Sequence, residues 1–232
     1  MTGIPYLSTS WEYPNHDGVG CNSRDPKDTE NFKLFLQELR GDDFGKNLTI
    51  TIAAGINPWL GEDGTPVKSV SDFVELIDYV AIMNYDIWGS WSKMVGPNAP
   101  LDDTCDQHPG TGSALSAIKT WTSAGMPPEK LVLGIAAYGH SFRVRNASAI
   151  TQDGSLASFP PFDGKDQPAG DQWDGKPGET DVCGNVSTTA GGIIQYSGMI
   201  SLGYIDSNGT AEPGRIRRFD NCSQTVCISY SI

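Results

Sequence analysis

Acidic and phenolic side chains follow two stretches that read as buried strands. Glu12 stands in the segment WEYP (residues 11–14), and Tyr85 and Asp86 close the segment MNYD (residues 83–86). In a parallel β/α barrel, catalytic groups gather at the carboxyl ends of the strands. A carboxylic acid on one strand end and a Tyr-Asp pair on another suit acid-catalysed attack on a glycosidic bond.

Aromatic residues near these segments are candidates for stacking on sugar rings, because they combine a large apolar face with a polar edge. Trp88 and Trp91 follow the MNYD segment, and Tyr138 ends the run LVLGIAAY. Trp59 follows an earlier strand and is interpreted as structural. The three histidines share no metal-ligand spacing and are interpreted as polar loop residues: His16, His108 and His140.

The cysteines form no CxxC pair, and their spacing does not match a zinc site, so disulfides are the better interpretation. Cys21 and Cys105 both lie in loops after the two chemical segments and are expected to meet. Cys183 is then expected to pair with Cys222, which leaves Cys227 over. No metal and no cofactor are predicted.

Composition narrows the classes of partner. The net charge of −12 disfavours nucleic acid and anionic membranes, which are themselves negative, whereas a neutral polysaccharide carries no such penalty. No run of about 18 apolar residues is present, so no membrane span is expected. The segment MTGIPYLSTSW has no signal-peptide features. An extracellular location is nevertheless expected from five glycosylation sequons, at Asn47, Asn146, Asn185, Asn208 and Asn221.

Strands and helices alternate along the first part of the chain, which indicates an α/β fold. Strands are expected at residues 4–11, 48–52, 79–83 and 131–137. Helices are expected at residues 28–40, with Asp28 as its cap, 71–76 and 113–124. The faces expected to turn inward consist of Phe32, Phe35, Leu36 and Leu39 on the first helix, and Leu115, Ile118 and Trp121 on the third.

The period changes after residue 142, where Gly, Pro, Asp and Ser become frequent. We therefore expect a partial barrel over residues 1–142, a small α+β insertion over 143–219, and a short return towards the barrel over 220–232.

Three ordered stretches, WEYP, MNYDIWGSWS and KLVLGIAAYGHSF, resemble the fungal secreted chitinases of glycoside hydrolase family 18. The resemblance covers nearly the whole chain. It implies a partial TIM (β/α)8 barrel, with these stretches as strands four, six and seven and LTITIAA as strand five. The segment after Phe142 then resembles the family's chitin-insertion domain. Strands one to three and strand eight have no counterpart, so the resemblance implies a barrel truncated at both ends.

The resemblance also implies retaining hydrolysis of β-1,4-linked N-acetylglucosamine, in which the substrate's own N-acetyl group is the nucleophile. Glu12 matches the proton donor, Tyr85 the residue that aims the acetamido carbonyl, and Asp86 a contact to sugar hydroxyls or amide. Met83 matches a position lining the acetamide pocket. The structural alternatives are a strand-end glutamate, a strand-capping aromatic, a turn cap and a core methionine, respectively.

The acid of this family ends a DxxDxDxE pattern, and here Ser10, Ser8 and Pro5 occupy the aspartate positions. Residues i and i−2 of a strand face the same side, so an aspartate there would assist the acid directly. Losing such a preorganised charge commonly costs a factor of about 10²–10³ in rate. Two hypotheses follow: an impaired chitinase acting on chitin or chitooligosaccharide, or a non-catalytic, lectin-like chitin binder or gene fragment. Open barrel edges also predict self-association.

Overall fold

The computed structural model describes residues 6–18, 20–105 and 110–229. The chain divides into two compact units, which are described separately. The first unit consists of residues 1–84 and 114–134, and the second of residues 85–113 and 135–232.

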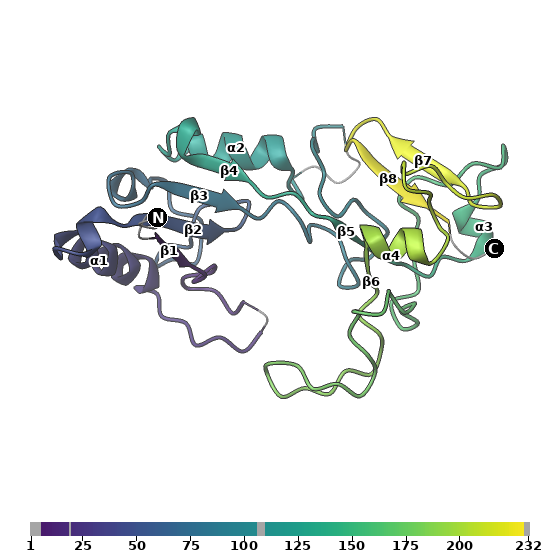
Figure 1. The fold of residues 1–232 in the computed structure, drawn as a ribbon, viewed down its shortest axis with the longest axis horizontal. Helices are drawn as coiled ribbons and strands as arrows, with labels where there is room; N and C mark the ends of the chain where they lie inside the picture. Colours follow the sequence, from purple (N-terminus) through teal and green to yellow (C-terminus); the bar gives the residue numbers. More distant parts are fainter. Residues whose placement is uncertain (1–5, 19, 106–109, 230–232) are drawn as a thin grey trace, which may run out of the picture. The chain divides into compact units, whose positions relative to one another are not determined.

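A four-stranded parallel sheet forms the centre of the first unit (Figure 1). Its strands lie in the order β1 (Tyr6–Thr9), β2 (Thr49–Ala54), β3 (Tyr79–Ile82) and β4 (Leu131–Leu133). The β-branched run of β2 suits an extended strand, and Ile50, Ile52 and Ala54 alternate onto one buried face. Each strand lies within or overlaps a predicted one, so the alternation read from the sequence is confirmed.

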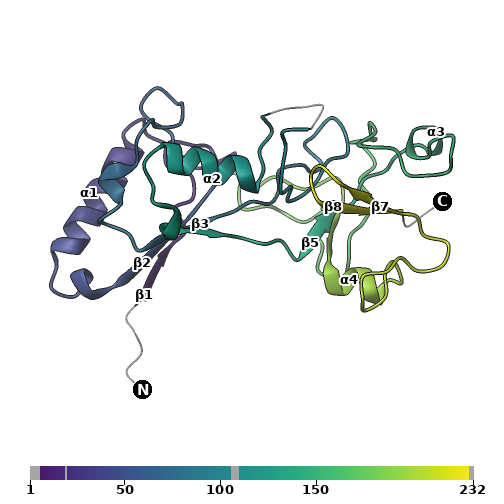
Figure 2. The same ribbon diagram turned by 90° about the horizontal axis from the view of Figure 1, so that it is seen from above.

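Both helices of the first unit pack on that buried face (Figure 2). Helix α1 (Asp28–Gly41) contributes Phe32 and Leu36, and helix α2 (Ala114–Ser123) contributes Ala117 and Trp121. The core continues through Trp59 and Phe73, whose rings contact each other. Trp59 is therefore structural, as predicted.

Three predicted inward side chains point elsewhere: Phe35, Leu115 and Ile118 are at least 36% exposed. In α2 the buried residues are Ala114, Ala117 and Trp121, so Trp121 faces inward as predicted, whereas Ala114 and Ala117 take the places expected for Leu115 and Ile118. The predicted cap was also wrong, because Asp28 is the first residue of α1 and its carboxylate instead accepts bonds from the backbone of Asn15 and Asp25.

The connections of the first unit include three short 3₁₀ turns, η1 (Gly45–Asn47), η2 (Ser71–Phe73) and η3 (Pro128–Lys130). The expected helix at 71–76 is thus reduced to the single turn η2. The predicted strand 131–137 also ends early, at Leu133.

The second unit is built from short elements. Strand β5 (Tyr138–His140) pairs antiparallel with β6 (Ile193–Gln195), and β7 (Arg217–Asp220) pairs antiparallel with β8 (Thr225–Ile228). The helices α3 (Asn146–Ala149) and α4 (Tyr196–Ser201) have one turn or little more. Strand β5 was not predicted.

Carboxylates tie these short elements together through the backbone. The two oxygens of Asp174 accept bonds from the backbone N–H groups of Gly170, Gly192 and Ile193, at 2.7, 2.9 and 3.0 Å. Asp171 accepts a bond from the backbone of Gln195 at 2.7 Å. Strand β6 is therefore held at both ends by buried or partly buried side-chain oxygens.

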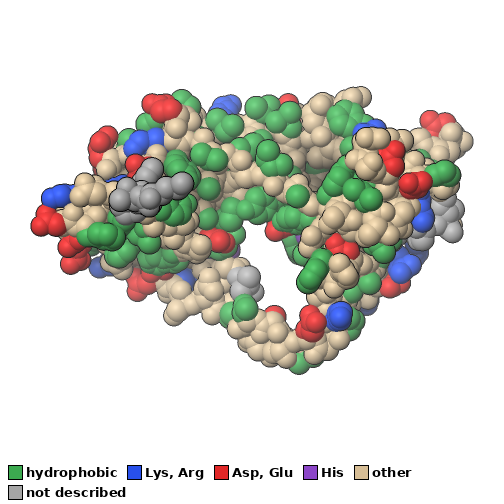
Figure 3. Space-filling view, viewed as in Figure 1, with side chains coloured by type: hydrophobic (Ala, Val, Ile, Leu, Met, Phe, Trp, Pro, Cys, Tyr) green, Lys and Arg blue, Asp and Glu red, His purple; other side chains and the backbone are tan. Residues whose placement is uncertain are grey.

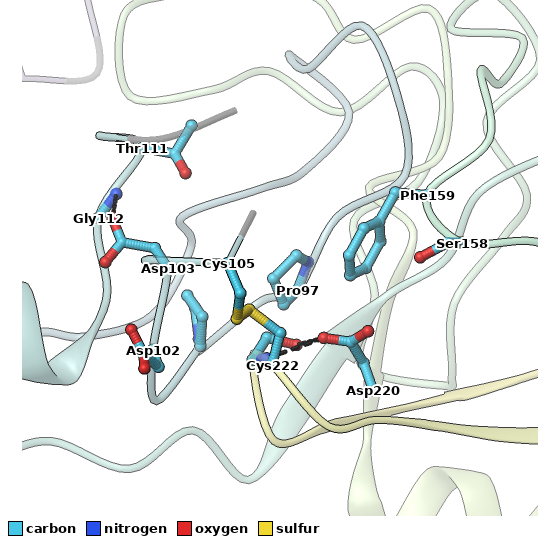
Figure 4. A pocket seen from close by; sticks show the side chains of 12 residues that line it. Pro97, Asp102, Asp103, Cys105, Thr111, Gly112, Ser158, Phe159, Asp220 and Cys222 are labelled. Atoms are coloured by element: carbon cyan, nitrogen blue, oxygen red, sulfur yellow. Dashed lines mark hydrogen bonds between the residues drawn. A yellow bond between two sulfur atoms is a disulfide. The ribbon is translucent and has the colours of Figure 1, made fainter. Parts of the chain in front are cut away.

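A disulfide joins Cys105 to Cys222 in the second unit (Figure 4). Both predicted pairings, Cys21 with Cys105 and Cys183 with Cys222, are therefore wrong. Spacing along the chain could not reveal this pair, which lies 117 residues apart. Cys227 is a free thiol, as predicted, and burial raises its pKa.

Asp103 and Asp220 flank this disulfide, beside a cavity of about 80 Å³ (Figure 4). Asp103 accepts bonds from the Gly112 backbone and the Ser113 hydroxyl, and Asp220 accepts bonds from Ser223. These carboxylates thus stabilise the local chain conformation by accepting hydrogen bonds from nearby residues.

Four exposed turns repeat one design, in which two residues six positions apart form an isolated bridge. They span residues 60–66, 150–156, 180–186 and 205–211. The fifth residue of each is a glycine with φ between 73° and 83°: Gly64, Gly154, Gly184 and Gly209. This left-handed conformation is one that glycine adopts without steric cost.

Acidic and basic side chains are interspersed on the face seen in Figure 3. In the part of the chain that the structure describes, no helix is both long and apolar enough to cross a membrane. Within the same residues, no group of three or more histidine, cysteine or acidic side chains could hold a metal ion.

Candidate carbohydrate-binding site

Asp86 is the centre of a hydrogen-bonded cluster in the second unit. Its backbone lies in the left-handed region, at φ 57°, which a non-glycine residue rarely adopts. The amide side chain of Asn98 bonds to the backbone of Asp86 and to the backbone of strand β5 at the same time. The Asn98 side chain accepts a bond from the Asp86 N–H at 2.9 Å and donates one to the Tyr138 carbonyl at 3.0 Å. The loop that carries Asp86 is thereby tied to strand β5.

Two side chains of β5 converge on one oxygen of this carboxylate. The Tyr138 hydroxyl donates to Asp86 Oδ1 at 2.6 Å, and His140 Nε2 lies 2.8 Å from the same oxygen. They reach it together because residues two apart on a strand share a face. Asp86 and Tyr138, two separate candidates of the sequence analysis, are therefore in direct contact.

These contacts shift the acidity of both partners. The hydrogen bond from His140 is the main cause that lowers the pKa of Asp86, opposed by partial burial and assisted by Tyr138. Burial, and then the bond to Asp86, raises the pKa of Tyr138 well above its ordinary value. At neutral pH the cluster therefore holds an ionised carboxylate beside a neutral phenol.

Aromatic rings surround the cluster. Trp91 is 62% exposed and meets the His140 ring edge-to-face, with centroids 5.4 Å apart. Tyr85 meets Tyr138 in a similar arrangement at 6.2 Å. The indole of Trp91 is mostly exposed, and its contact with a sugar ring stays a prediction.

Trp88, the other tryptophan expected to stack on a sugar ring, is buried. It is only 8% exposed, and the backbone of Gly96 lies so close to its indole that an added Cβ would meet the ring at 2.2 Å. Its ring is packed inside the protein and offers no free face to a sugar.

Strand β5 also borders a hollow of about 1130 Å³ in the second unit. Asn98, Tyr138 and His140 line it together with apolar side chains such as Met199 and Val226. The cluster around Asp86 thus adjoins a mostly apolar depression.

Glu12 and Met83 belong to the first unit. Glu12 follows β1 and is partly buried, and Met83 follows β3 directly, with its backbone N–H bonded to the Ala54 carbonyl. On β1, Ser8 Oγ accepts a bond from Thr51 Oγ1 at 3.3 Å, and Ser10 is exposed. Neutral hydroxyls thus occupy the two positions before Glu12 where the resemblance places aspartates.

Two residues of the Asp86 cluster, His140 and Asn98, were not predicted as site residues from the sequence. His140 was interpreted as a loop residue, which is wrong: it lies in β5 and its side chain is 6% exposed. Its place two residues after Tyr138 was the available signal. Asn98 lies in an irregular loop with no such signal. His16 is a loop residue, as predicted, and His108 lies outside the described residues.

An ionised carboxylate beside an exposed indole is a combination that can bind an uncharged sugar, through a hydroxyl or amide donor and a ring face. The sequence model described as glycosyl hydrolases family 18 matches residues 7–225. The chain belongs to this family. A family 18 chain is expected to have a TIM-barrel-type α/β fold, and the parallel sheet of the first unit agrees with it.

Two relatives of this chain are named chitinase-like effectors. The one from Moniliophthora roreri is 48% identical over 223 residues, which are 94% of this chain and 53% of that protein. The one from Moniliophthora perniciosa is 44% identical over 224 residues, 95% of this chain and 50% of that protein. The chain thus spans about half the length of these curated relatives.

A solved structure gives the same result for the fold. The crystal structure of a chitinase from Rhizomucor miehei matches with a TM-score of 0.81 at 30% identity, covering 95% of this chain and 57% of that chain.

Proposed function

We propose that this family 18 protein binds chitooligosaccharides, the β-1,4-linked oligomers of N-acetylglucosamine, and hydrolyses them poorly or not at all. The observation that carries the proposal is the ionised Asp86 carboxylate, fixed by Tyr138 and His140 beside the exposed indole of Trp91. The carboxylate accepts a sugar hydroxyl or acetamide N–H, while the indole stacks on a ring face. The names of the two effector relatives favour a role other than efficient hydrolysis.

The proposal assigns residual chemistry to Glu12, as donor of a proton to the leaving oxygen. Tyr85 would orient the acetamido carbonyl for its attack on the anomeric carbon, with Met83 lining the acetamide pocket. Ser8 and Ser10 offer hydroxyls, which carry no negative charge to stabilise a developing cation. Turnover is therefore expected to fall by a factor of at least about 10² relative to a site with both aspartates.

The same proposal extends to architecture and location. The first unit's strands would correspond to strands four to seven of the barrel, and residues 143–219 to the chitin-insertion domain. The Cys105–Cys222 disulfide and the exposed sequon asparagines suit an oxidising, extracellular environment. Among the described strands, β1 and β4 each pair on one side only, which supports the proposed self-association.

Calorimetric titration with chitohexaose, alongside a hydrolysis assay in the same buffer, tests the function. Binding is expected for chitohexaose and not for cellohexaose, which lacks the acetamido groups. W91A is expected to weaken binding by up to about tenfold, because stacking on an aromatic ring is worth on the order of 0.5–1.5 kcal/mol. W173A, which removes an exposed tryptophan elsewhere in the second unit, is the matched control.

The variant E12Q gives the background for hydrolysis. If wild type and E12Q release sugar at the same rate, the protein is a binder. Release by wild type well above E12Q would contradict the loss of catalysis, and equal affinity for the two hexamers would contradict chitin recognition. The double change S8D/S10D then shows whether the serines alone limit turnover.

A further inference from the structure

The two oxygens of the Asp86 carboxylate are used unequally. Oδ1 accepts both described bonds, from the Tyr138 hydroxyl at 2.6 Å and from His140 Nε2 at 2.8 Å. An ionised carboxylate has about four acceptor positions, two on each oxygen. Oδ1 is therefore saturated, and the acceptor positions that remain belong to Oδ2, on a side chain that is 48% exposed.

The orientation of the carboxylate is fixed at several points. Asn98 holds the Asp86 backbone in its left-handed conformation, and β5 holds Oδ1 through two donors. A strained backbone of this kind persists only where its surroundings determine it. We call these three residues, Asn98 on the backbone and Tyr138 and His140 on Oδ1, the Asp86 clamp. A surface aspartate that serves only solubility does not need to be held in this way.

His140 is the less obvious half of this clamp. Its side chain is 6% exposed, and the Trp91 ring meets it edge-to-face, so it is shielded from solvent and directed at Asp86. Because Asp86 is ionised, the Nε2 atom must carry the proton of this bond. The neutral Nε2–H tautomer and the imidazolium both satisfy this requirement.

We propose that His140 is a positioning residue which, together with Tyr138, turns Asp86 so that it presents the single oxygen Oδ2 to one ligand donor. That donor is a sugar hydroxyl or an acetamide N–H, since an ionised carboxylate can only accept. This inference rests on the proposed function for the nature of the ligand. The clamp itself is a property of the ligand-free protein and can be tested without sugar.

Carboxyl-detected NMR titration of ligand-free protein tests the clamp directly. The titratable groups that act on Asp86 are Tyr138 and His140, both on β5, and Tyr85 acts in turn on Tyr138. H140A and Y138F should each shift the titration midpoint of Asp86 upward, because each removes a donor that favours the ionised form. H140Q keeps an N–H donor at a similar reach and should return the midpoint towards that of wild type.

H16A is the matched control, because it removes an imidazole from the first unit and should leave the Asp86 midpoint unchanged. A purely structural role for His140 predicts equal damage from H140A and H140Q. Unchanged midpoints in both H140A and Y138F, or no rescue by H140Q in a protein that melts like wild type, would overturn the inference.

Affinity for chitotriose completes the test. H140A should weaken binding about tenfold, in line with a hydrogen bond to a charged group, and H140Q should weaken it less. An H140A variant with wild-type affinity would contradict the role of the clamp in binding. If wild type itself binds no chitotriose, the proposed function fails, while the carboxyl titration still decides whether His140 positions Asp86.

Discussion

The two units hold together in different ways. The first has a continuous apolar core, in which Phe32, Trp59, Phe73 and Trp121 pack between two helices and a parallel sheet. The second has short strands and single-turn helices, and its buried residues include the polar side chains of Asp103, Gln167 and Asp174. Burial of apolar area stabilises the one, and directed hydrogen bonds order the other.

The two kinds of packing respond differently to substitution. An apolar core tolerates changes of detail provided that volume and pattern are kept. A polar network fails when one partner is lost, because the remaining group is left buried without a bond. The cluster around Asp86 lies in the second kind of structure, where the position of each donor matters.

The largest effect is expected for Trp121, at the centre of the first core. W121A removes a fully buried indole and should reduce the free energy of unfolding by about 4 kcal/mol. Urea denaturation followed by circular dichroism measures the loss. W173A removes an indole that is 74% exposed and should change stability little. Similar losses for both variants would mean that the apolar core is not what stabilises the first unit.

A smaller effect is expected for Asp174 in the second unit. D174N keeps the size of the side chain but weakens three bonds to backbone N–H groups by removing the charge, a loss of about 2 kcal/mol. Hydrogen exchange should show faster opening of β6 in particular. The control D163N changes an exposed aspartate that accepts one described bond, from Lys165. Unchanged exchange of β6 in D174N would show that polar side chains do not order this unit.

The smallest effect is expected for Asp153, on the loss of protein stability at low pH. The Thr151 hydroxyl, followed by Ser155, lowers the pKa of Asp153 to about 2 in the folded protein. Because this value lies below the ordinary value of about 3.9, the contribution of Asp153 is present above about pH 4 and is lost as the pH falls towards 2. D153N should therefore flatten the dependence of the melting temperature on pH in that window.

The turn at residues 60–66 is the counterpart of this turn in the first unit. Bonds from Thr65 lower the pKa of Asp63 in the same direction. D63N should flatten the same window if the turn acts alike in both units. A steep acid loss that neither variant alters would assign the effect to other carboxylates.

The first unit was largely predictable because its pattern is periodic. Apolar residues at helical spacing located α1, and the β-branched run located β2. The prediction that failed there was which face of helix α2 points into the core. Leu115 and Ile118 looked like the inward face of α2, yet the smaller Ala114 and Ala117 occupy it and leave the larger side chains outside.

The candidate site was only partly predictable. The segment MNYD pointed to Asp86, and the end of LVLGIAAY pointed to Tyr138, which contact each other. Composition could not reveal that Trp88 is buried while Trp91 is exposed, because both follow the same strand. The Cys105–Cys222 pair and the role of Asn98 depend on loop paths, which carry no periodic signal.

The repeated bridged turns have a practical consequence. Exposed turn tips with small and polar residues are among the sites where a domain best tolerates insertions. The tip at Asp63 and Gly64 belongs to the first unit, and the tip at Asn208 and Gly209 belongs to the second. A short peptide tag or fluorophore-labelling sequence placed at either tip would report on one unit alone. The chain thus carries ready attachment points for following its two units independently as they fold.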